Sequence, residues 1–139
     1  MKKILLMTIT LLLLVGCGSK DKKVTCKKEF SDEFSKIVYE DVITYQDNEV
    51  LKVNSEMNLT FNEKNDDFSM FEGYASATKE EYNKKNGITS TLKTEDKSII
   101  LSVEYDLKNM EALEITNYNL DLDIEKIKEK YTASGYTCK

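Results

Sequence analysis

The sequence predicts an α+β domain in which a mostly antiparallel sheet, built from two hairpins, carries helices packed on one face. Two stretches, 37–61 and 88–105, largely alternate apolar with polar residues around a short polar turn, as strands with one solvent-exposed face do. Between and after these stretches, apolar residues recur three or four positions apart, which is typical of amphipathic helices. The expected order is therefore strand, hairpin, helix, hairpin, helix, strand.

The first hairpin follows a short strand that is predicted over Val24–Phe30. Ile37–Tyr45 is rich in β-branched and aromatic residues, which favours a strand, and Asp47-Asn48 supplies residues that tolerate a tight turn. The returning strand has apolar residues at Leu51, Val53, Met57, Leu59 and Phe61. This pattern predicts an antiparallel pair of strands.

A helix is predicted after the polar connection 62–67, with Asn86-Gly87 as its end. Its apolar face is formed by Phe68, Phe71, Ala75 and Tyr82. Gly73 weakens the middle of this helix, and residues 78–81 have the sequence of a capping box, so a second helix could begin there. One continuous helix and two shorter helices are both compatible with the sequence.

The second hairpin is predicted from Ile88–Thr94 and from the alternating run 99–105, with its turn at 95–97. Residues 106–119 are expected to be irregular or briefly helical.

The C-terminal segment predicts a last helix and a last strand. Asp123 can cap the helix, Gly135 can end it, and residues 136–138 can return as a short strand. The apolar face of this helix is formed by Ile124, Ile127 and Tyr131.

The first 17 residues differ in pattern from the rest of the chain. A basic start at 1–3 precedes an uncharged, mostly apolar run at 4–15. This run is too short to cross a bilayer as a helix, which takes roughly 20 residues. Its end, Leu14-Val15-Gly16-Cys17, resembles the lipobox, in which a signal peptidase cuts before a cysteine that carries a diacylglycerol. The alternatives are an uncleaved anchor helix and an ordinary secretory peptide.

These segments divide the chain into a signal peptide at 1–16, a lipidated Cys17 with a polar tether at 17–23, and a single domain at 24–139. Two or more hydrocarbon chains on Cys17 would hold the protein on a bilayer. The domain is therefore expected on the extracytoplasmic face of the bacterial cell membrane.

Cys26 and Cys138 remain once Cys17 carries lipid. Disulfides persist in exported proteins, and these two cysteines bracket the predicted domain, so we expect them to pair. The alternative is a redox or metal-binding thiol pair. The sequence has no C-x-x-C spacing and no histidine to support that alternative.

Several short features occur together along the chain. These are the cysteine near the first strand, the lysine-rich alternating sheet, Asp106-Leu107-Lys108-Asn109-Met110 and the ending Gly135-Tyr136-Thr137-Cys138-Lys139. In combination they resemble the small YehR-like lipoproteins of Gram-positive bacteria. The resemblance covers nearly the whole mature chain. Because that family has no established activity, the resemblance implies a fold and a location without a reaction.

The composition excludes several functions. All 20 basic residues are lysines, against 25 acidic residues, and histidine is absent, so the formal charge is −5. The absence of histidine rules out Ser-His-Asp and Cys-His nucleophile pairs. An acidic domain without arginine is poorly suited to phosphate backbones. We therefore predict no enzyme, no cofactor and no nucleic-acid partner.

Acidic residues supply weak candidate sites. Asp121, Asp123 and Glu125 fall at positions 1, 3 and 5 of a calcium loop, but Lys126 and Thr132 stand where that loop needs glycine and glutamate. We therefore predict a helix N-terminus there and no metal site. The other carboxylates are expected on the solvated surface, including Glu40-Asp41, Glu63, Asp66-Asp67 and Glu80-Glu81.

Tyrosines and lysines are the remaining candidates. The eight tyrosines could form a sugar- or peptide-binding platform. We expect three of them in the core, namely Tyr82, Tyr105 and Tyr131, and leave four unassigned, namely Tyr39, Tyr45, Tyr74 and Tyr118. Four lysines that could serve as bases are expected on wet faces: Lys52, Lys93, Lys126 and Lys130. No catalytic residue is predicted.

Three functions are compatible with these observations. The first is a non-catalytic envelope lipoprotein that contacts a protein or wall component through a sheet edge or an open sheet face. The second is a lipoprotein that binds a small ligand between sheet and helices. The third is a hydrolase that uses carboxylates alone. We favour the first, because so short a chain leaves little room for a deep cavity and the lack of histidine disfavours catalysis.

Overall fold

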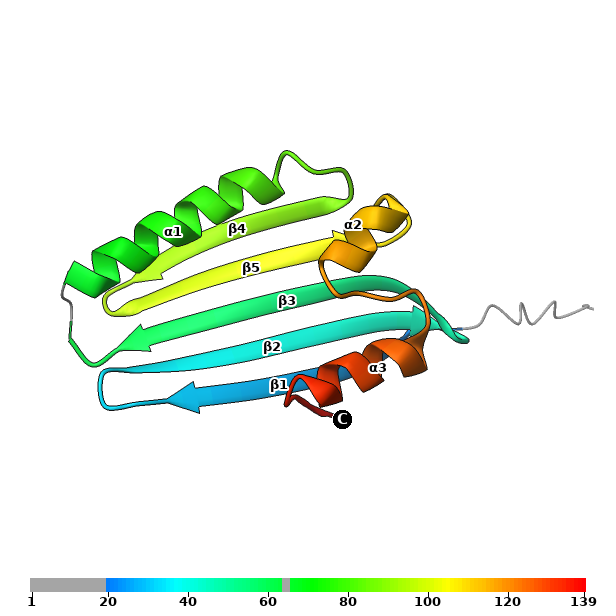
Figure 1. Ribbon diagram of the computed structural model, residues 1–139, viewed down its shortest axis with the longest axis horizontal. Coiled ribbons are helices and arrows are strands. Elements are labelled where there is room, and N and C mark those ends of the chain that lie inside the picture. The colour runs from blue at the N-terminus through cyan, green and yellow to red at the C-terminus, as the bar shows by residue number, and fades with distance from the viewer. Residues whose placement is uncertain (1–19, 64–65) are drawn as a thin grey trace, which may run out of the picture.

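The computed structural model describes residues 20–63 and 66–139, which form an open six-stranded sheet with three helices on one face (Figure 1). Neighbouring strands are antiparallel, in the order β4-β5-β3-β2-β1-β6. The strands are β1 (Lys22–Ser31), β2 (Ser35–Gln46), β3 (Glu49–Phe61), β4 (Ile88–Glu95), β5 (Ser98–Asp106) and β6 (Thr137–Cys138). The helices are α1 (Asp66–Tyr82), α2 (Ala112–Asn117) and α3 (Ile124–Ala133). The predicted α+β class and both predicted hairpins are confirmed.

The two hairpins join through their second strands. In the first hairpin Ser35 pairs with Phe61, and the turn places Asp47 at a positive φ of 53°. Asp and Asn tolerate this left-handed backbone better than most residues do. Strand β3 then pairs with β5 of the second hairpin, from Lys52 opposite Asp106 to the far end of the sheet. One continuous sheet results.

Helix α1 continues past Gly73, so the prediction of a single helix is the correct alternative. A Cβ at Gly73 would meet nothing within 4 Å, which places this residue on an open side of the helix. The opposite side packs on the sheet, where Phe68 and Ala75 are buried against Ile99 and its neighbours. This packing holds the helix together despite the glycine.

The C-terminal segment adds strand β6 beside β1, at the edge of the sheet opposite β4. Asp123 caps α3 as predicted, because its carboxylate accepts hydrogen bonds from the backbone N–H groups of Glu125 and Lys126 at 2.9 and 3.1 Å. Strand β6 then pairs with β1, so that Cys138 lies opposite Cys26 with their Cα atoms 4.0 Å apart, and a disulfide joins the two residues. The predicted pairing ties the last strand to the first.

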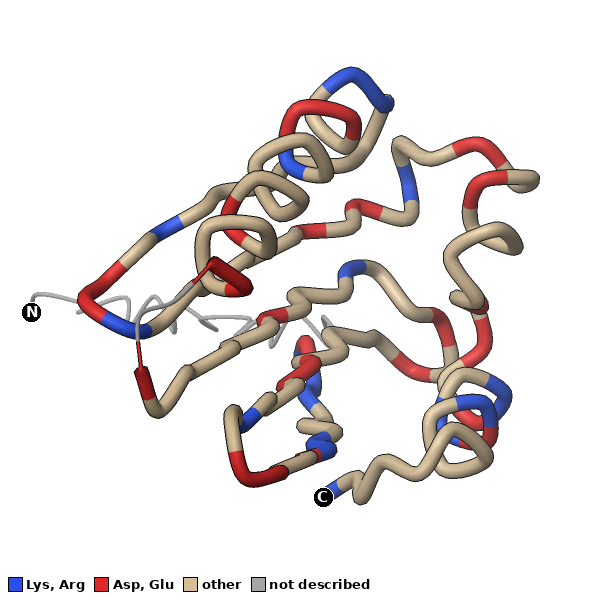
Figure 2. Tube along the Cα trace, turned by 60° about the vertical axis from the view of Figure 1, so that its left-hand side comes forward, with Lys and Arg blue, Asp and Glu red and all other residues tan. Residues whose placement is uncertain are grey.

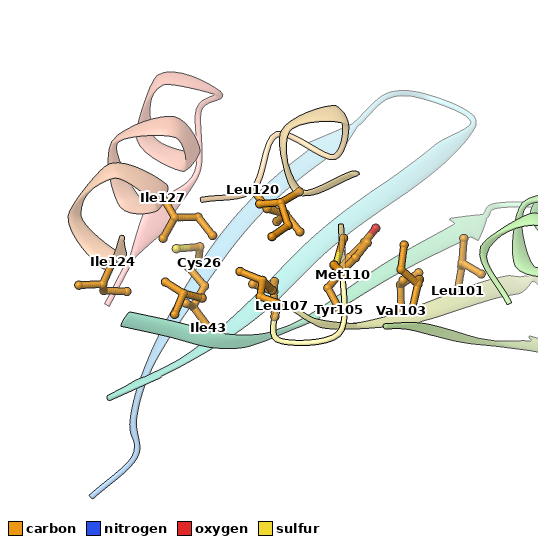
Figure 3. Close-up of a cluster of buried hydrophobic side chains, with 14 residues drawn as sticks. Cys26, Ile43, Leu101, Val103, Tyr105, Leu107, Met110, Leu120, Ile124 and Ile127 are labelled. Atoms are coloured by element: carbon orange, nitrogen blue, oxygen red, sulfur yellow. The ribbon is translucent and has the colours of Figure 1, made fainter. Parts of the chain in front are cut away.

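The main core lies between the sheet and the C-terminal helices (Figure 3). Ile127 of α3 points toward Cys26 and Ile43 of the sheet, and all three side chains are 0% exposed. A second cluster lies under α1. The two clusters occupy different parts of the same sheet face.

The N-terminal boundary of the domain differs from the prediction. Strand β1 begins at Lys22, which pairs with Tyr45, so two residues that we assigned to the tether belong to the sheet. The lipobox residues Leu14, Val15, Gly16 and Cys17 lie outside the described residues. Within the described ranges no helix is long and apolar enough to cross a membrane.

Candidate functional site

Strand alternation gives the sheet two unlike faces. In the part of the chain that the structure describes, one face carries no helix. This face has exposed ion pairs, such as Lys27 with Glu40, and Lys52 with Glu104 at 2.9 Å. On the other face, α1 packs on β4 and β5, while α3 lies at β6 near the opposite edge. Acidic and basic residues are interspersed along the helices, strands and turns (Figure 2).

A groove of about 500 Å³ opens on the helix-bearing face, over the middle strands of the sheet. Asp41 of β2 and Ser55 of β3, which are direct cross-strand partners, lie in its lining with Met57 beside them. Six of the eight tyrosines also line it: Tyr39, Tyr82, Tyr105, Tyr118, Tyr131 and Tyr136. We call this feature the tyrosine groove.

The tyrosine groove is open to solvent and is not a deep cavity, so it does not contradict the expectation that the chain has little room for one. Its volume falls in the range of about 300 to 1,000 Å³ that small-molecule sites occupy. The groove exists because α1 and α3 pack near opposite edges of the sheet and do not meet over its centre.

Asp41 is the central polar residue of the tyrosine groove. It is only 5% exposed, so the expectation that Glu40-Asp41 lies on solvated surface is wrong for Asp41. The reason is strand alternation: Glu40 points to the open face, and Asp41 points to the same face as Tyr39 and Ile43. Period-two alternation, applied to the polar residues as well as the apolar ones, would have predicted this burial.

Burial raises the pKa of the Asp41 carboxyl above its ordinary value of 3.8, because the charged form loses hydration. Side-chain hydrogen bonds with Ser55, Tyr131 and Tyr136 act in the opposite direction, since they stabilise the carboxylate, but burial is the larger effect. The tyrosine groove therefore contains a carboxyl group that is more easily protonated than a surface aspartate.

The tyrosines form two walls. On the β5 side the rings of Tyr82 and Tyr105 each lie 5.4 Å from that of Tyr118, centre to centre. On the β2 side the ring of Tyr136 lies 4.9 Å from that of Tyr131 and 6.4 Å from that of Tyr39. Such edge-on and tilted contacts are favourable for aromatic rings, so each wall is a packed unit.

The phenols are held in their neutral form. Burial raises the pKa of Tyr136 to about 12, and the nearby Asp41 charge adds to this effect. Burial also raises the pKa values of Tyr105 and Tyr131. At neutral pH these hydroxyls are therefore hydrogen-bond donors that no realistic change of pH ionises.

Two lysines lie at the rim of the tyrosine groove. The Nζ of Lys28 donates to the backbone oxygen of Ser134 and lies 5.7 Å from the centre of the Tyr136 ring. The Nζ of Lys130 donates to the backbone oxygen of Leu120 at 2.7 Å and pairs with Asp121 at 3.2 Å. Lys130 is thus two-thirds buried and lines the groove, which corrects its predicted place on a wet face.

The predicted carboxylate candidates other than Asp41 do not line the tyrosine groove. Asp123 caps α3 and Asp121 binds Lys130, so the acidic segment 121–125 acts in local structure. Within the described ranges, no group of three or more acidic, cysteine or histidine residues is arranged to hold a metal ion. Asp41 is the one buried carboxylate in the same ranges.

Only part of the tyrosine cluster was predictable. Tyr105 is buried as expected, whereas Tyr82 and Tyr131 are half-buried and present surface to the groove. Tyr39 and Tyr118 had no assigned place and prove to line it. The strand position of Tyr39 two residues before Asp41 was the available signal, since both must share a face.

Comparison with known proteins identifies the fold. No protein-family model matches the sequence, and no curated protein sequence does. The structure is similar to the NMR structure of a protein from Streptococcus pneumoniae TIGR4, with a TM-score of 0.57 and 16% identity over 100% of this chain and 97% of the other. It is also similar to the NMR structure of the Escherichia coli YehR protein, with a TM-score of 0.56 and 19% identity over 85% of this chain and 91% of the other. The expected resemblance is confirmed at the level of structure: the chain has a YehR-like fold.

Proposed function

We propose that this protein is a lipid-anchored binding module of the bacterial cell envelope, without catalytic activity, that holds a small ligand in the tyrosine groove. The buried Asp41 beneath two tyrosine walls is the observation that carries this proposal. Ligand sites are typically concave, mostly apolar or aromatic, and equipped with a few polar groups that converge on the ligand. The tyrosine groove has each of these properties.

This proposal favours a small ligand over a protein or wall component bound to the open sheet face. The open face offers exposed lysine and glutamate side chains that pair with each other, such as Lys52 with Glu104. Exposed pairs of this kind contribute little binding energy. The tyrosine groove instead offers ring surface and a desolvated carboxylate, which contribute more to binding when a ligand covers them.

The proposed anchor is Cys17, which would place the domain at the extracytoplasmic membrane surface through its lipid. Strand β1 begins at Lys22, so only a short tether would separate lipid and sheet. The absence of catalysis is proposed because glycoside hydrolysis by carboxylates uses a pair flanking the bond, and Asp41 is the single buried carboxylate of residues 20–63 and 66–139.

Ligand-observed NMR tests the binding function. The purified full chain is screened against a mixed library of sugars, amino acids, amines and short acids. Binding should weaken strongly in Tyr39→Ala and Tyr118→Ala, each of which removes a ring from one wall, and should persist in Tyr74→Ala. Tyr74 is the matched control because it is 65% exposed on α1 and does not line the groove. If no compound depends on the wall tyrosines, the proposed function is wrong.

A further inference from the structure

The charge on Asp41 has no cationic partner in the described protein. Ion pairs link lysines to other carboxylates, but none links a lysine to Asp41 within the described ranges. The two lysines that line the groove have other partners. Lys28 donates to the carbonyl of Ser134 and lies 5.7 Å from the centre of the Tyr136 ring, and Lys130 is bound by Asp121 and a backbone oxygen. Hydroxyl groups alone therefore stabilise the carboxylate of Asp41.

The surroundings of Asp41 are aromatic. Tyr131 and Tyr136 hydrogen-bond to it from one wall, and the wall of Tyr82, Tyr105 and Tyr118 stands across the groove. The faces of aromatic rings attract cations, and the attraction grows where water is excluded. A carboxylate set among rings is the combination that recognises organic ammonium groups, because it supplies both the counter-charge and the apolar contact.

We propose that the tyrosine groove binds a compact organic ammonium ion, with its nitrogen over the Asp41 carboxylate and its carbon substituents against the tyrosine rings. This inference rests on the proposed ligand-binding function and names the chemical class of the ligand. The groove volume of about 500 Å³ accommodates such an ion together with part of a larger molecule that carries it.

A cation over Asp41 also makes binding depend on pH. Protonation of Asp41 removes the counter-charge, so the affinity for an ammonium ion should fall as the pH decreases through the titration of this carboxyl. Two lysines and six tyrosines also line this space: Lys28, Lys130, Tyr39, Tyr82, Tyr105, Tyr118, Tyr131 and Tyr136. Glu56 of β3 is part of the lining as well, but its carboxylate lies on the open face of the sheet, beside Ser102. Burial raises the pKa values of Tyr105, Tyr118, Tyr131 and Tyr136, so these phenols remain neutral as the pH decreases. Asp121 is paired with Lys130.

Two matched pairs of probes test the inference: butylammonium with 1-butanol, and tetramethylammonium with tert-butanol. The members of a pair have similar shape and differ in charge. In NMR titrations of the full chain at neutral pH, we expect at least one cation to bind about tenfold more tightly than its neutral partner. The shifted signals should include the rings of Tyr131 and Tyr136.

Variants and pH separate the role of Asp41 from general binding. Asp41→Asn should reduce the affinity for the cation to that for its neutral partner, and Asp96→Asn, at the exposed β4–β5 turn, should leave the preference unchanged. If Asp41→Asn does not fold, acidification of the wild-type protein gives the same test without a substitution, because the affinity for the cation alone should fall.

The possible results distinguish this inference from the proposed function. If the neutral members bind in the groove as tightly as the cations, or if Asp41→Asn keeps the preference, the ammonium assignment is wrong and the groove remains a ligand site. If no probe and no compound of the mixed library shifts the groove tyrosines, both proposals are wrong.

Discussion

Cys26 and Asp41 are direct cross-strand partners in the β1–β2 ladder, and both are buried. On its other side Cys26 is joined to Cys138, and Tyr136, two residues earlier, hydrogen-bonds to Asp41. The disulfide and the central carboxylate of the tyrosine groove are therefore parts of one structural unit. Whatever loosens β6 should also expose Asp41.

Removal of the disulfide should destabilise the domain. The bond joins residues 112 positions apart, and the chain-entropy model assigns about 4 to 5 kcal/mol to a loop of this length. Replacing Cys26 and Cys138 together by serine should lower the free energy of unfolding by about 2 to 5 kcal/mol, measured by urea denaturation. Two titratable thiols in the native wild-type protein would show that the bond does not form.

Asp41→Asn should change how stability depends on pH. Because burial raises the pKa of Asp41 in the folded state, the folded protein holds this proton at pH values where the unfolded chain has lost it. The contribution of Asp41 to stability is thus fully present below about pH 3.8 and is lost as the pH rises through the folded-state pKa. The amide of the variant does not titrate.

The measurement is the difference in free energy of unfolding between Asp41→Asn and wild type, taken from pH 3 to pH 7. This difference should move in favour of the variant as the pH rises, and Asp96→Asn, at the exposed β4–β5 turn, is the matched control. A difference that stays constant, or that moves in favour of the wild type, contradicts a raised pKa of Asp41 in the folded protein.

Alanine substitutions at two glycines should change the stability of the protein in opposite directions. Gly87 has a φ of 76°, and a Cβ there would lie 2.8 Å from the backbone oxygen of Asp106 and 2.9 Å from the backbone carbon of Asn109. Gly87→Ala should therefore cost roughly 2 kcal/mol or more. Gly73 lies in α1 with nothing near its Cβ position, so Gly73→Ala should stabilise the protein by roughly 0.5 to 1 kcal/mol.

Thermal and urea denaturation of the two variants would check the contrast. Equal effects of the two substitutions would mean that the turn at Gly87 or the continuity of α1 is described wrongly.

Replacement of Cys17 by serine tests the proposed anchor. The variant should be uncleaved or secreted, should no longer partition with membranes in the manner of a lipoprotein, and should incorporate no labelled fatty acid. Fractionation and labelling identical to wild type would rule out lipidation at this residue.

The sequence predicted the elements better than the site. Strands, turns and the cap at Asp123 follow from local patterns. The pairing of Cys26 with Cys138 follows from counting the cysteines that remain once Cys17 is assigned to the proposed anchor. The tyrosine groove depends on how far α1 and α3 stand apart on the sheet, which no local pattern encodes. Tyr118, for example, lies in a connecting segment, where neither the 3.6-residue period of a helix nor the two-residue period of a strand indicates a face.

Asp41 is a site residue whose burial could have been predicted from the sequence. Strand alternation places Asp41 on the buried face of the sheet. Charged residues are ordinarily solvated, however, and this general rule leads to the wrong prediction for Asp41. For a polar residue on the apolar side of a predicted strand, strand alternation therefore predicts burial better than residue type does.

The titration of Asp41 tests the structure of the tyrosine groove most directly. In the ligand-free protein, the ¹³Cγ signal of Asp41 should titrate with a midpoint above the ordinary value of 3.8, because burial outweighs the hydrogen bonds from Ser55, Tyr131 and Tyr136. The signals of Tyr131 and Tyr136 should move with the same midpoint. A midpoint at or below 3.8, with no response of these two tyrosines, would contradict a buried carboxylate at the centre of the groove.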